Sequence, residues 1–111
     1  MDDVVCARIQ LQPNSLLRVR EWAAYMNLHK EDALRTLRHE GVTIESVFLE
    51  SVEGEGDYLI YYMRAASLKE AAEVAAASLA DIDKYHKQFK QATWAKVTRL
   101  EMLLDLAIEK N

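Results

Sequence analysis

The sequence has one cysteine, no excess of basic residues and no long apolar run, and each absence excludes a class of protein. Because Cys6 is alone, no disulfide can form within the chain and no multi-cysteine metal site can be built. The net charge of −4 argues against a nucleic-acid partner, which usually needs a concentrated basic surface. No apolar run approaches the roughly 20 residues that span a bilayer, and the start Met-Asp-Asp does not resemble a secretory leader. We therefore expect a cytoplasmic protein without a membrane partner.

The spacing of hydrophobic residues changes along the chain in a definite order. Strict alternation over residues 4–11 predicts a strand with one buried face. Helical spacing follows over residues 16–37, with an interruption at Lys30 that predicts a bend or break near residues 28–31. Gly41 then stands where a left-handed helix cap is expected.

The middle of the sequence predicts a β-hairpin. Residues 42–51 and 58–65 are rich in β-branched and aromatic side chains, and the polar segment 53–57 between them contains two glycines.

A second helical region and a last alternating segment complete the pattern. Ser67 and Glu70 have the spacing of a capping box, and helical spacing continues from there toward Trp94. Alternation over residues 98–108 predicts the final strand. The order βαββαβ predicts an α+β, ferredoxin-like single domain over residues 1–111, with a four-stranded antiparallel sheet and helices on one face.

The other face of that sheet would be exposed in a monomer, and it would mix apolar and charged side chains. Its expected members are Cys6, Arg8, Gln10, Glu101, Leu103 and Asp105, together with one alternating set from the hairpin. Which set that is stays open, and Thr43, Glu45, Val47 and Leu49 suit such a mixed face. The direction of the tyrosines in residues 58–65 stays open. Such a face either packs against a second copy, with Arg8, Glu101 and Asp105 as paired interface charges, or forms the wall of a small-molecule cavity. We expect a homodimer.

Two stretches carry a resemblance to a known superfamily: DYLIYYM at residues 57–63 and IDKYHKQF at residues 82–89, with Trp94 after them. They resemble uncharacterised small bacterial proteins of the dimeric α/β-barrel superfamily of ferredoxin-like domains. The resemblance implies that two sheets pack face to face into one barrel, with a cavity beside each helical layer. The matching stretches carry no assigned chemistry.

Oxygenase relatives in that superfamily, including haem-degrading ones, use a first-strand asparagine with a tryptophan and a helix histidine. His86 matches the histidine. The first-strand candidates here are Cys6, Arg8 and Gln10, and none is an asparagine. This departure puts oxygenase chemistry in doubt.

His86 is the best single candidate for a catalytic residue. It shares a helical stripe with apolar residues, where the pKa of an imidazole can be moved. A histidine that only satisfies a buried hydrogen-bond partner would give the same pattern. Tyr62, Trp94, Trp22 and Tyr58 are expected to line a ligand pocket near it, and simple aromatic packing is the alternative.

These patterns support three functional hypotheses. The first is a homodimer that binds a small organic molecule between helices and sheet. The second is a cofactor-independent monooxygenase or isomerase with His86 as acid or base. The third is a purely structural or interaction module. We expect no cofactor and no metal, because the three histidines are too scattered for a zinc site.

Overall fold

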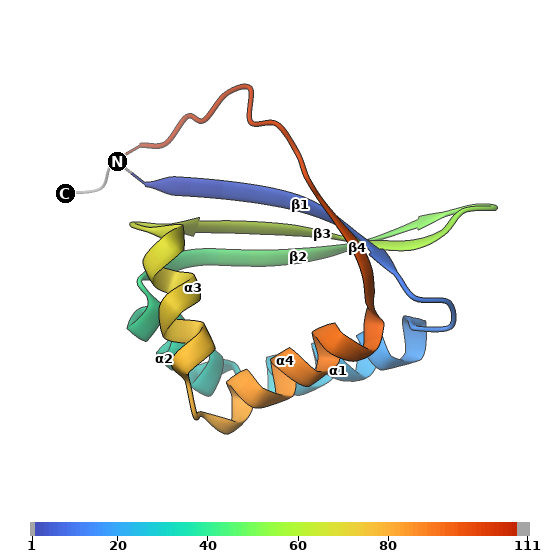
Figure 1. The fold of residues 1–111 in the computed structure, drawn as a ribbon, viewed down its shortest axis with the longest axis horizontal. Coiled ribbons are helices and arrows are strands. Elements are labelled where there is room, and N and C mark those ends of the chain that lie inside the picture. The colour runs from blue at the N-terminus through green and yellow to red at the C-terminus, as the bar shows by residue number, and fades with distance from the viewer. Residues whose placement is uncertain (1, 109–111) are drawn as a thin grey trace.

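The computed structural model describes residues 2–108 and contains two β-α-α-β halves. The elements are β1 (Asp3–Leu11), α1 (Leu16–Leu28), α2 (Lys30–Glu40), β2 (Val42–Val52), β3 (Gly56–Ala65), α3 (Leu68–Ala77), α4 (Asp81–Thr93) and β4 (Trp94–Arg99). The strands pair antiparallel in the order β2-β3-β1-β4. All four helices lie on one side of this sheet, as Figure 1 shows. The predicted ferredoxin-like α+β fold is confirmed.

Local sequence signals account for the helix boundaries. α1 and α2 are separated at His29, within the predicted break. Gly41 ends α2 with a φ of 77°, a left-handed conformation that glycine adopts without a Cβ penalty. The Ser67 hydroxyl accepts a hydrogen bond from the backbone N–H of Glu70 at 3.2 Å and so caps α3. Residues 78–80 divide the second helical region into α3 and α4, a break that the sequence pattern did not predict.

The last strand differs from the prediction. β4 spans Trp94–Arg99 rather than residues 98–108, because pairing starts directly after α4, where the Thr93 carbonyl accepts a hydrogen bond from the Gln12 N–H. Residues 100–108 leave the sheet, and the one backbone hydrogen bond of this segment to β1 runs from Leu100 N to Cys6 O at 2.9 Å. Alternation of apolar and polar residues indicates an extended backbone, whether or not another strand pairs with that segment.

The side chains of β2 that suited the mixed face do not all point there, and a bulge is the reason. Val42 is buried on the helix side, and the register with β3 shifts between Val42 and Ile44. A bulge moves every later side chain to the other face. Glu45 and Val47 therefore point toward the helices, next to Tyr61, whereas Ile44 and Phe48 point away.

The core lies between the sheet and the helices, and it is divided. The larger cluster is built around Ile9, Leu59 and Phe89, with the Trp22 ring stacked on Phe89 at 4.5 Å. The smaller cluster contains Val42, Ala65 and Ala71. Because alanines fill the second cluster, this end of the helical layer supplies little apolar volume.

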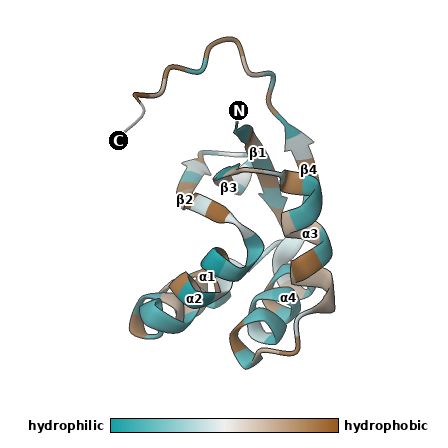
Figure 2. Cartoon of the chain, turned by 90° about the vertical axis from the view of Figure 1, so that its left-hand side faces the viewer, coloured by the Kyte–Doolittle hydropathy of each residue, from teal (hydrophilic) through white to brown (hydrophobic). Residues whose placement is uncertain are grey.

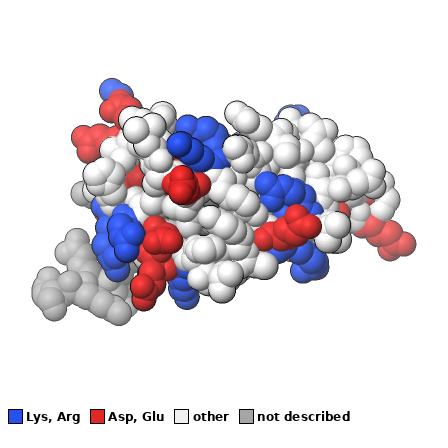
Figure 3. Space-filling model, turned by 90° about the horizontal axis from the view of Figure 1, so that it is seen from below, with Lys and Arg blue, Asp and Glu red and all other residues white. Residues whose placement is uncertain are grey.

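The outer surface of the helices carries acidic and basic side chains interspersed, without a large area of one sign (Figure 3). No helix among residues 2–108 is long and apolar enough to cross a membrane.

Candidate functional site

A cavity of about 630 Å³ lies between the helical layer and the sheet. This volume is within the usual range for small-molecule sites, about 300–1,000 Å³. Its walls are mostly apolar, with side chains such as Ala7, Met26, Leu37, Val47 and Met63. The ionisable side chains in its lining include Glu40, Glu45, Asp83, His86 and Lys90.

Four side chains of the cavity wall form one line of hydrogen bonds, which we call the relay: Trp22, His86, Tyr61 and Glu45. Trp22 Nε1 donates to His86 Nδ1 at 3.0 Å. His86 Nε2 lies 3.3 Å from the Tyr61 hydroxyl, and that hydroxyl donates to Glu45 Oε1. The relay therefore joins two helices to two strands across the cavity.

The fold brings these four residues together from distant parts of the sequence. Tyr61 lies on the helix-facing side of β3, directly opposite Val47, and Glu45 lies two residues from Val47 on the same side of β2. His86 lies one turn before Phe89 on α4, and Trp22 of α1 stacks on that Phe89.

The hydrogen bonds determine which nitrogen of His86 carries the proton. Burial, with the Lys90 charge as a second cause, lowers the pKa of His86 to about 4, so the ring is neutral at pH 7. Since Nδ1 accepts from Trp22, the proton of the neutral ring is on Nε2. Nε2–H is then the donor to Tyr61, and the relay runs in one direction, toward Glu45.

Burial also changes the acid–base properties of the end of the relay. It raises the pKa of Glu45, while the hydrogen bond from Tyr61 and the Lys90 charge act in the opposite direction. Burial and the neighbouring Glu45 charge raise the pKa of the Tyr61 phenol well above its usual value. Tyr61 therefore stays protonated and acts as a donor to Glu45.

Glu40 is a second unusual carboxyl group in the cavity lining. Burial raises its pKa to about 7, with further contributions from the charges of Asp83 and Glu45. A carboxyl with this pKa exchanges its proton near neutral pH, which is the range that acid–base chemistry needs.

The Trp94 side chain lines the same cavity. Its Nε1 atom is buried and has no hydrogen-bond partner among residues 2–108. A buried N–H without a partner is costly, about 1–3 kcal/mol. An acceptor on a bound molecule would remove this cost.

Comparison with known proteins places the chain in a family. A family model matches residues 2–111. The chain belongs to the Family of unknown function (DUF6176). None of the curated proteins matches it.

Solved structures support the fold of this DUF6176 chain. An uncharacterised NIPSNAP-like domain protein from Burkholderia xenovorans has 15% identity and a TM-score of 0.59, with 97% of this chain and 91% of that chain covered. A putative antibiotic biosynthesis monooxygenase from Bacteroides thetaiotaomicron has 17% identity and a TM-score of 0.57, with 98% and 96% covered. A dimeric protein of unknown function and ferredoxin-like fold from Bacteroides fragilis has 17% identity and a TM-score of 0.55, with 89% and 92% covered. At these identities the likeness concerns the fold.

The structure separates the five residues that the sequence grouped in one pocket. Trp22, His86 and Trp94 line the cavity. Tyr58 and Tyr62 do not, because they alternate with Tyr61 along β3 and so face the opposite side of the sheet. Their contacts are there too: the Arg8 guanidinium lies 3.7 Å from the Tyr58 ring centre, and Arg64 Nε donates to the Tyr62 hydroxyl at 3.3 Å.

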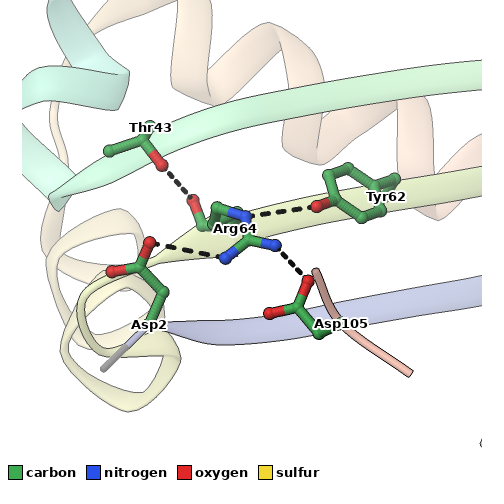
Figure 4. A network of polar contacts seen from close by, with 5 residues as sticks. All are labelled: Asp2, Thr43, Tyr62, Arg64 and Asp105. Carbon is green, nitrogen blue, oxygen red and sulfur yellow. Dashed lines mark hydrogen bonds and ion pairs between the residues drawn. The ribbon is translucent and has the colours of Figure 1, made fainter. Parts of the chain in front are cut away.

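The three predicted interface charges do not form one cluster within the chain. Arg8 pairs with Glu50 on β2 at 2.9 Å. Asp105 pairs with Arg64, which also lies 3.5 Å from Asp2 (Figure 4). Glu101 is exposed and belongs to neither pair. The last strand was expected to carry two of these charges, and residues 101 and 105 lie beyond its end.

Sequence reasoning missed Glu40, Glu45 and the inward position of Tyr61. Glu45 was grouped with Val47 and Leu49 because such a mixed set suits the opposite face. The chain has no glycine at the bulge to signal the change of face.

The donor set of the cavity suits an organic molecule better than a metal ion. No group of three or more His, Cys, Asp or Glu side chains among residues 2–108 could hold a metal. The first strand presents only apolar side chains, Val5, Ala7 and Ile9, to the cavity, whereas Arg8 points away. The first-strand position of the oxygenase relatives thus has no polar counterpart here.

Proposed function

We propose that this protein binds a small, largely apolar organic molecule in the cavity between helices and sheet. One observation carries the proposal: an apolar cavity of about 630 Å³ has the relay along its wall and Trp94 in its lining, and the indole N–H of that Trp94 is buried without a partner. Apolar walls with a few fixed polar groups are typical of small-molecule sites.

The polar groups indicate what such a molecule would carry. Trp94 Nε1 is a hydrogen-bond donor, so it would pair with an acceptor on the ligand, such as a carbonyl. Glu45 and Glu40 call for a donor, such as a hydroxyl, and their charges disfavour a carboxylate ligand. We therefore favour phenols and quinones over short acids.

A thermal-shift titration with a naphthol, a naphthoquinone and benzoate tests this proposal. We expect the first two to raise the melting temperature and benzoate to have no effect. Ligand at 100 times its Kd stabilises by about 2.7 kcal/mol. Each kcal/mol shifts the melting temperature of a domain of this size by about 4–8 °C, so the expected shift is roughly 10–20 °C.

Matched variants locate the binding. Trp94→Phe and His86→Ala should weaken it, whereas Tyr62→Phe, on the other sheet face, should leave it unchanged. The proposal fails if no phenol or quinone binds, or if Trp94→Phe and His86→Ala bind as tightly as the wild type.

A second candidate is a cofactor-independent monooxygenase or isomerase. The observation that favours it is Glu45, a partly buried carboxylate with a raised pKa at the end of the relay. Both reactions begin when a base takes a proton from an activated carbon of the substrate. An oxygenase would then also need dioxygen as the oxidant. The B. thetaiotaomicron neighbour named as a putative antibiotic biosynthesis monooxygenase shares the fold.

Exchange of deuterium from solvent into an enolisable aryl ketone, followed by NMR, separates the two candidates. A catalyst with Glu45 as base would speed the exchange, and Glu45→Gln would stop it. Binding without accelerated exchange would leave only the first candidate.

We also propose a homodimer that packs through the open face of the sheet, defined here by Cys6, Arg8, Ile44, Phe48, Tyr58, Tyr62 and Arg64. Ile44 and Phe48 are exposed on it, and the B. fragilis neighbour is described as dimeric. A purely structural module would use this face alone. Light scattering at micromolar concentration tests the dimer, and a monomer there would contradict it. A cytoplasmic location, suggested by the single free cysteine, is part of the same proposal.

A further inference from the structure

A second hollow, of about 490 Å³, lies on the outer side of the helical layer, and we call it the outer hollow. It is formed where the last turns of α2 meet the end of α3 and the start of α4. Figure 2 looks onto this end of the molecule, with α2 on one side and α3 and α4 on the other. Thr36, Glu40 and Asp83 line both the outer hollow and the cavity. The two spaces are therefore neighbours that share one wall.

The charged side chains around the outer hollow are sorted by depth. Glu40 and Asp83 are half-buried and line both spaces. Arg35, Arg38 and His39 are exposed and line the outer hollow but not the cavity. A negatively charged group therefore meets carboxylates on the inner side of the shared wall and basic side chains on its outer side.

Arg38 is available to hold such a negatively charged group. In the part of the chain that the structure describes, no ion pair involves Arg38, whereas Arg35 pairs with Asp32 at 3.2 Å. The Asp83 carboxylate accepts a hydrogen bond from the Ser78 hydroxyl and pairs with neither arginine. An arginine guanidinium offers a planar fork of N–H donors that matches the two oxygens of a carboxylate. The outer hollow can therefore bind an acid group.

We propose that the ligand of the cavity is an acid with a long apolar body, and that its acid group lies in the outer hollow beside Arg38. Its aromatic end then stays in the cavity beside the relay, and its chain passes Thr36 in the shared wall. A short acid would instead place its charge near Glu40, where burial and the charges of Asp83 and Glu45 already disfavour a carboxylate and raise its pKa. This inference rests on the proposed function and specifies the chemical class of its ligand.

Matched pairs of ligands test where the acid group lies. Each pair compares an alcohol with the corresponding acid: hydroxymethylnaphthol with hydroxynaphthoate, and hydroxynaphthyl alcohols with hydroxynaphthyl acids on butyl, hexyl and octyl chains. In calorimetric titrations we expect the alcohol to bind more tightly in the shortest pair. In a longer pair the acid should bind about fivefold more tightly, the upper end for an exposed ion pair, and salt should weaken this preference. The inference is overturned if the acid is preferred at no chain length.

Charge-removing variants test the role of the two arginines. Arg35→Gln combined with Arg38→Gln should abolish the preference for the long acid over its alcohol. Arg20→Gln combined with Lys69→Gln is the matched control, because these two residues are exposed and line neither space. The control removes the same amount of charge and should keep the preference. Equal losses in both variants would mean that net charge alone attracts the acid, and the inference would be wrong.

Thr36→Phe tests the passage between the two spaces. A larger side chain in the shared wall should weaken binding of the long acid more than binding of naphthol. Equal effects on both ligands would mean that the chain of the acid does not pass Thr36, against the inference.

The proposed function and this inference fail in different ways. If the wild type binds neither naphthol nor the long acid, both are wrong. If naphthol binds but no acid is preferred over its alcohol, the cavity still binds apolar molecules, and the inference about the acid group is wrong alone.

Discussion

Trp22 Nε1 donates a hydrogen bond to Nδ1 of His86, and this bond orients the imidazole ring so that Nε2 faces Tyr61. A neutral imidazole has one N–H, so an accepting Nδ1 leaves the proton on Nε2. The donor Nε2–H faces Tyr61, and Tyr61 donates to Glu45. A side chain of α1 is thus linked through three hydrogen bonds to a carboxylate on β2, which is distant in sequence.

We predict that His86 is neutral above pH 5 and carries its proton on Nε2. Two-dimensional ¹H–¹⁵N spectra of the imidazole should show this tautomer and a pKa of about 4. Trp22→Phe removes the donor and should allow the other tautomer to appear. A wild-type ring that titrates near 6.5 would contradict the prediction.

The lowered pKa of His86 also makes the free energy of unfolding depend on pH. The pKa of His86 is lower in the folded state than its ordinary value of 6.5, so the unfolded state binds the proton more tightly. The stabilisation is complete above pH 6.5 and is lost as the pH falls toward 4, by about 3 kcal/mol in total. Urea denaturation at pH 7 and pH 4 measures this loss. His86→Gln, which cannot titrate, should have a smaller loss over that range.

Glu40 should give the opposite dependence on pH. Its pKa is raised from 4.5 to about 7 in the folded protein, so the folded state binds the proton more tightly. The associated stabilisation is complete below pH 4.5 and is lost as the pH rises through 7. Glu40→Gln should therefore be more stable than the wild type at pH 8, and this advantage should disappear by pH 4.5. Urea denaturation at both pH values, with Glu21→Gln on exposed α1 surface as control, checks the sign.

The fold could be predicted from the sequence because its signals are local and repeated. The helix break at His29, the left-handed Gly41 and the Ser67 cap each follow from a few neighbouring residues. The end of β4 could not be predicted in this way, because residues 100–108 alternate as a strand does although they leave the sheet.

The candidate site depends on longer-range facts. His86, Trp22 and Trp94 were identified because aromatic residues and a histidine on apolar stripes tend to be buried. Glu45 was grouped with the opposite face, whereas one bulge between Val42 and Ile44 inverts the alternation of β2. A one-residue irregularity without glycine or proline leaves no mark in the sequence, yet it brings a carboxylate into the cavity.

We predict that Tyr61→Phe and Tyr62→Phe, two neighbouring and chemically identical changes, have different effects. Tyr61→Phe removes the hydrogen bond that lowers the pKa of Glu45, so that pKa should rise further. It should also cost about 1–3 kcal/mol of stability, because buried partners lose a hydrogen bond. Tyr62→Phe loses only a 3.3 Å contact with Arg64 and should cost less. Urea denaturation of both variants measures the difference, and equal costs would contradict the burial of the relay.

The two phenylalanines provide the last prediction, because they separate the core from the open face. Phe89 is fully buried and stacks on Trp22, so Phe89→Ala should cost about 3–5 kcal/mol and disturb the position of His86 one turn away. Phe48 is 60% exposed within one chain, so Phe48→Ala should hardly change the stability of the monomer. If the open face packs against a second copy, Phe48→Ala weakens the dimer instead. Urea denaturation at low and at high protein concentration distinguishes these outcomes. The loss of stability caused by Phe89→Ala should be the same at both concentrations. The loss caused by Phe48→Ala should appear only at high concentration, where the wild-type dimer adds to stability. A Phe48→Ala protein as stable as the wild type at both concentrations would mean that the open face of β2 contributes nothing to association.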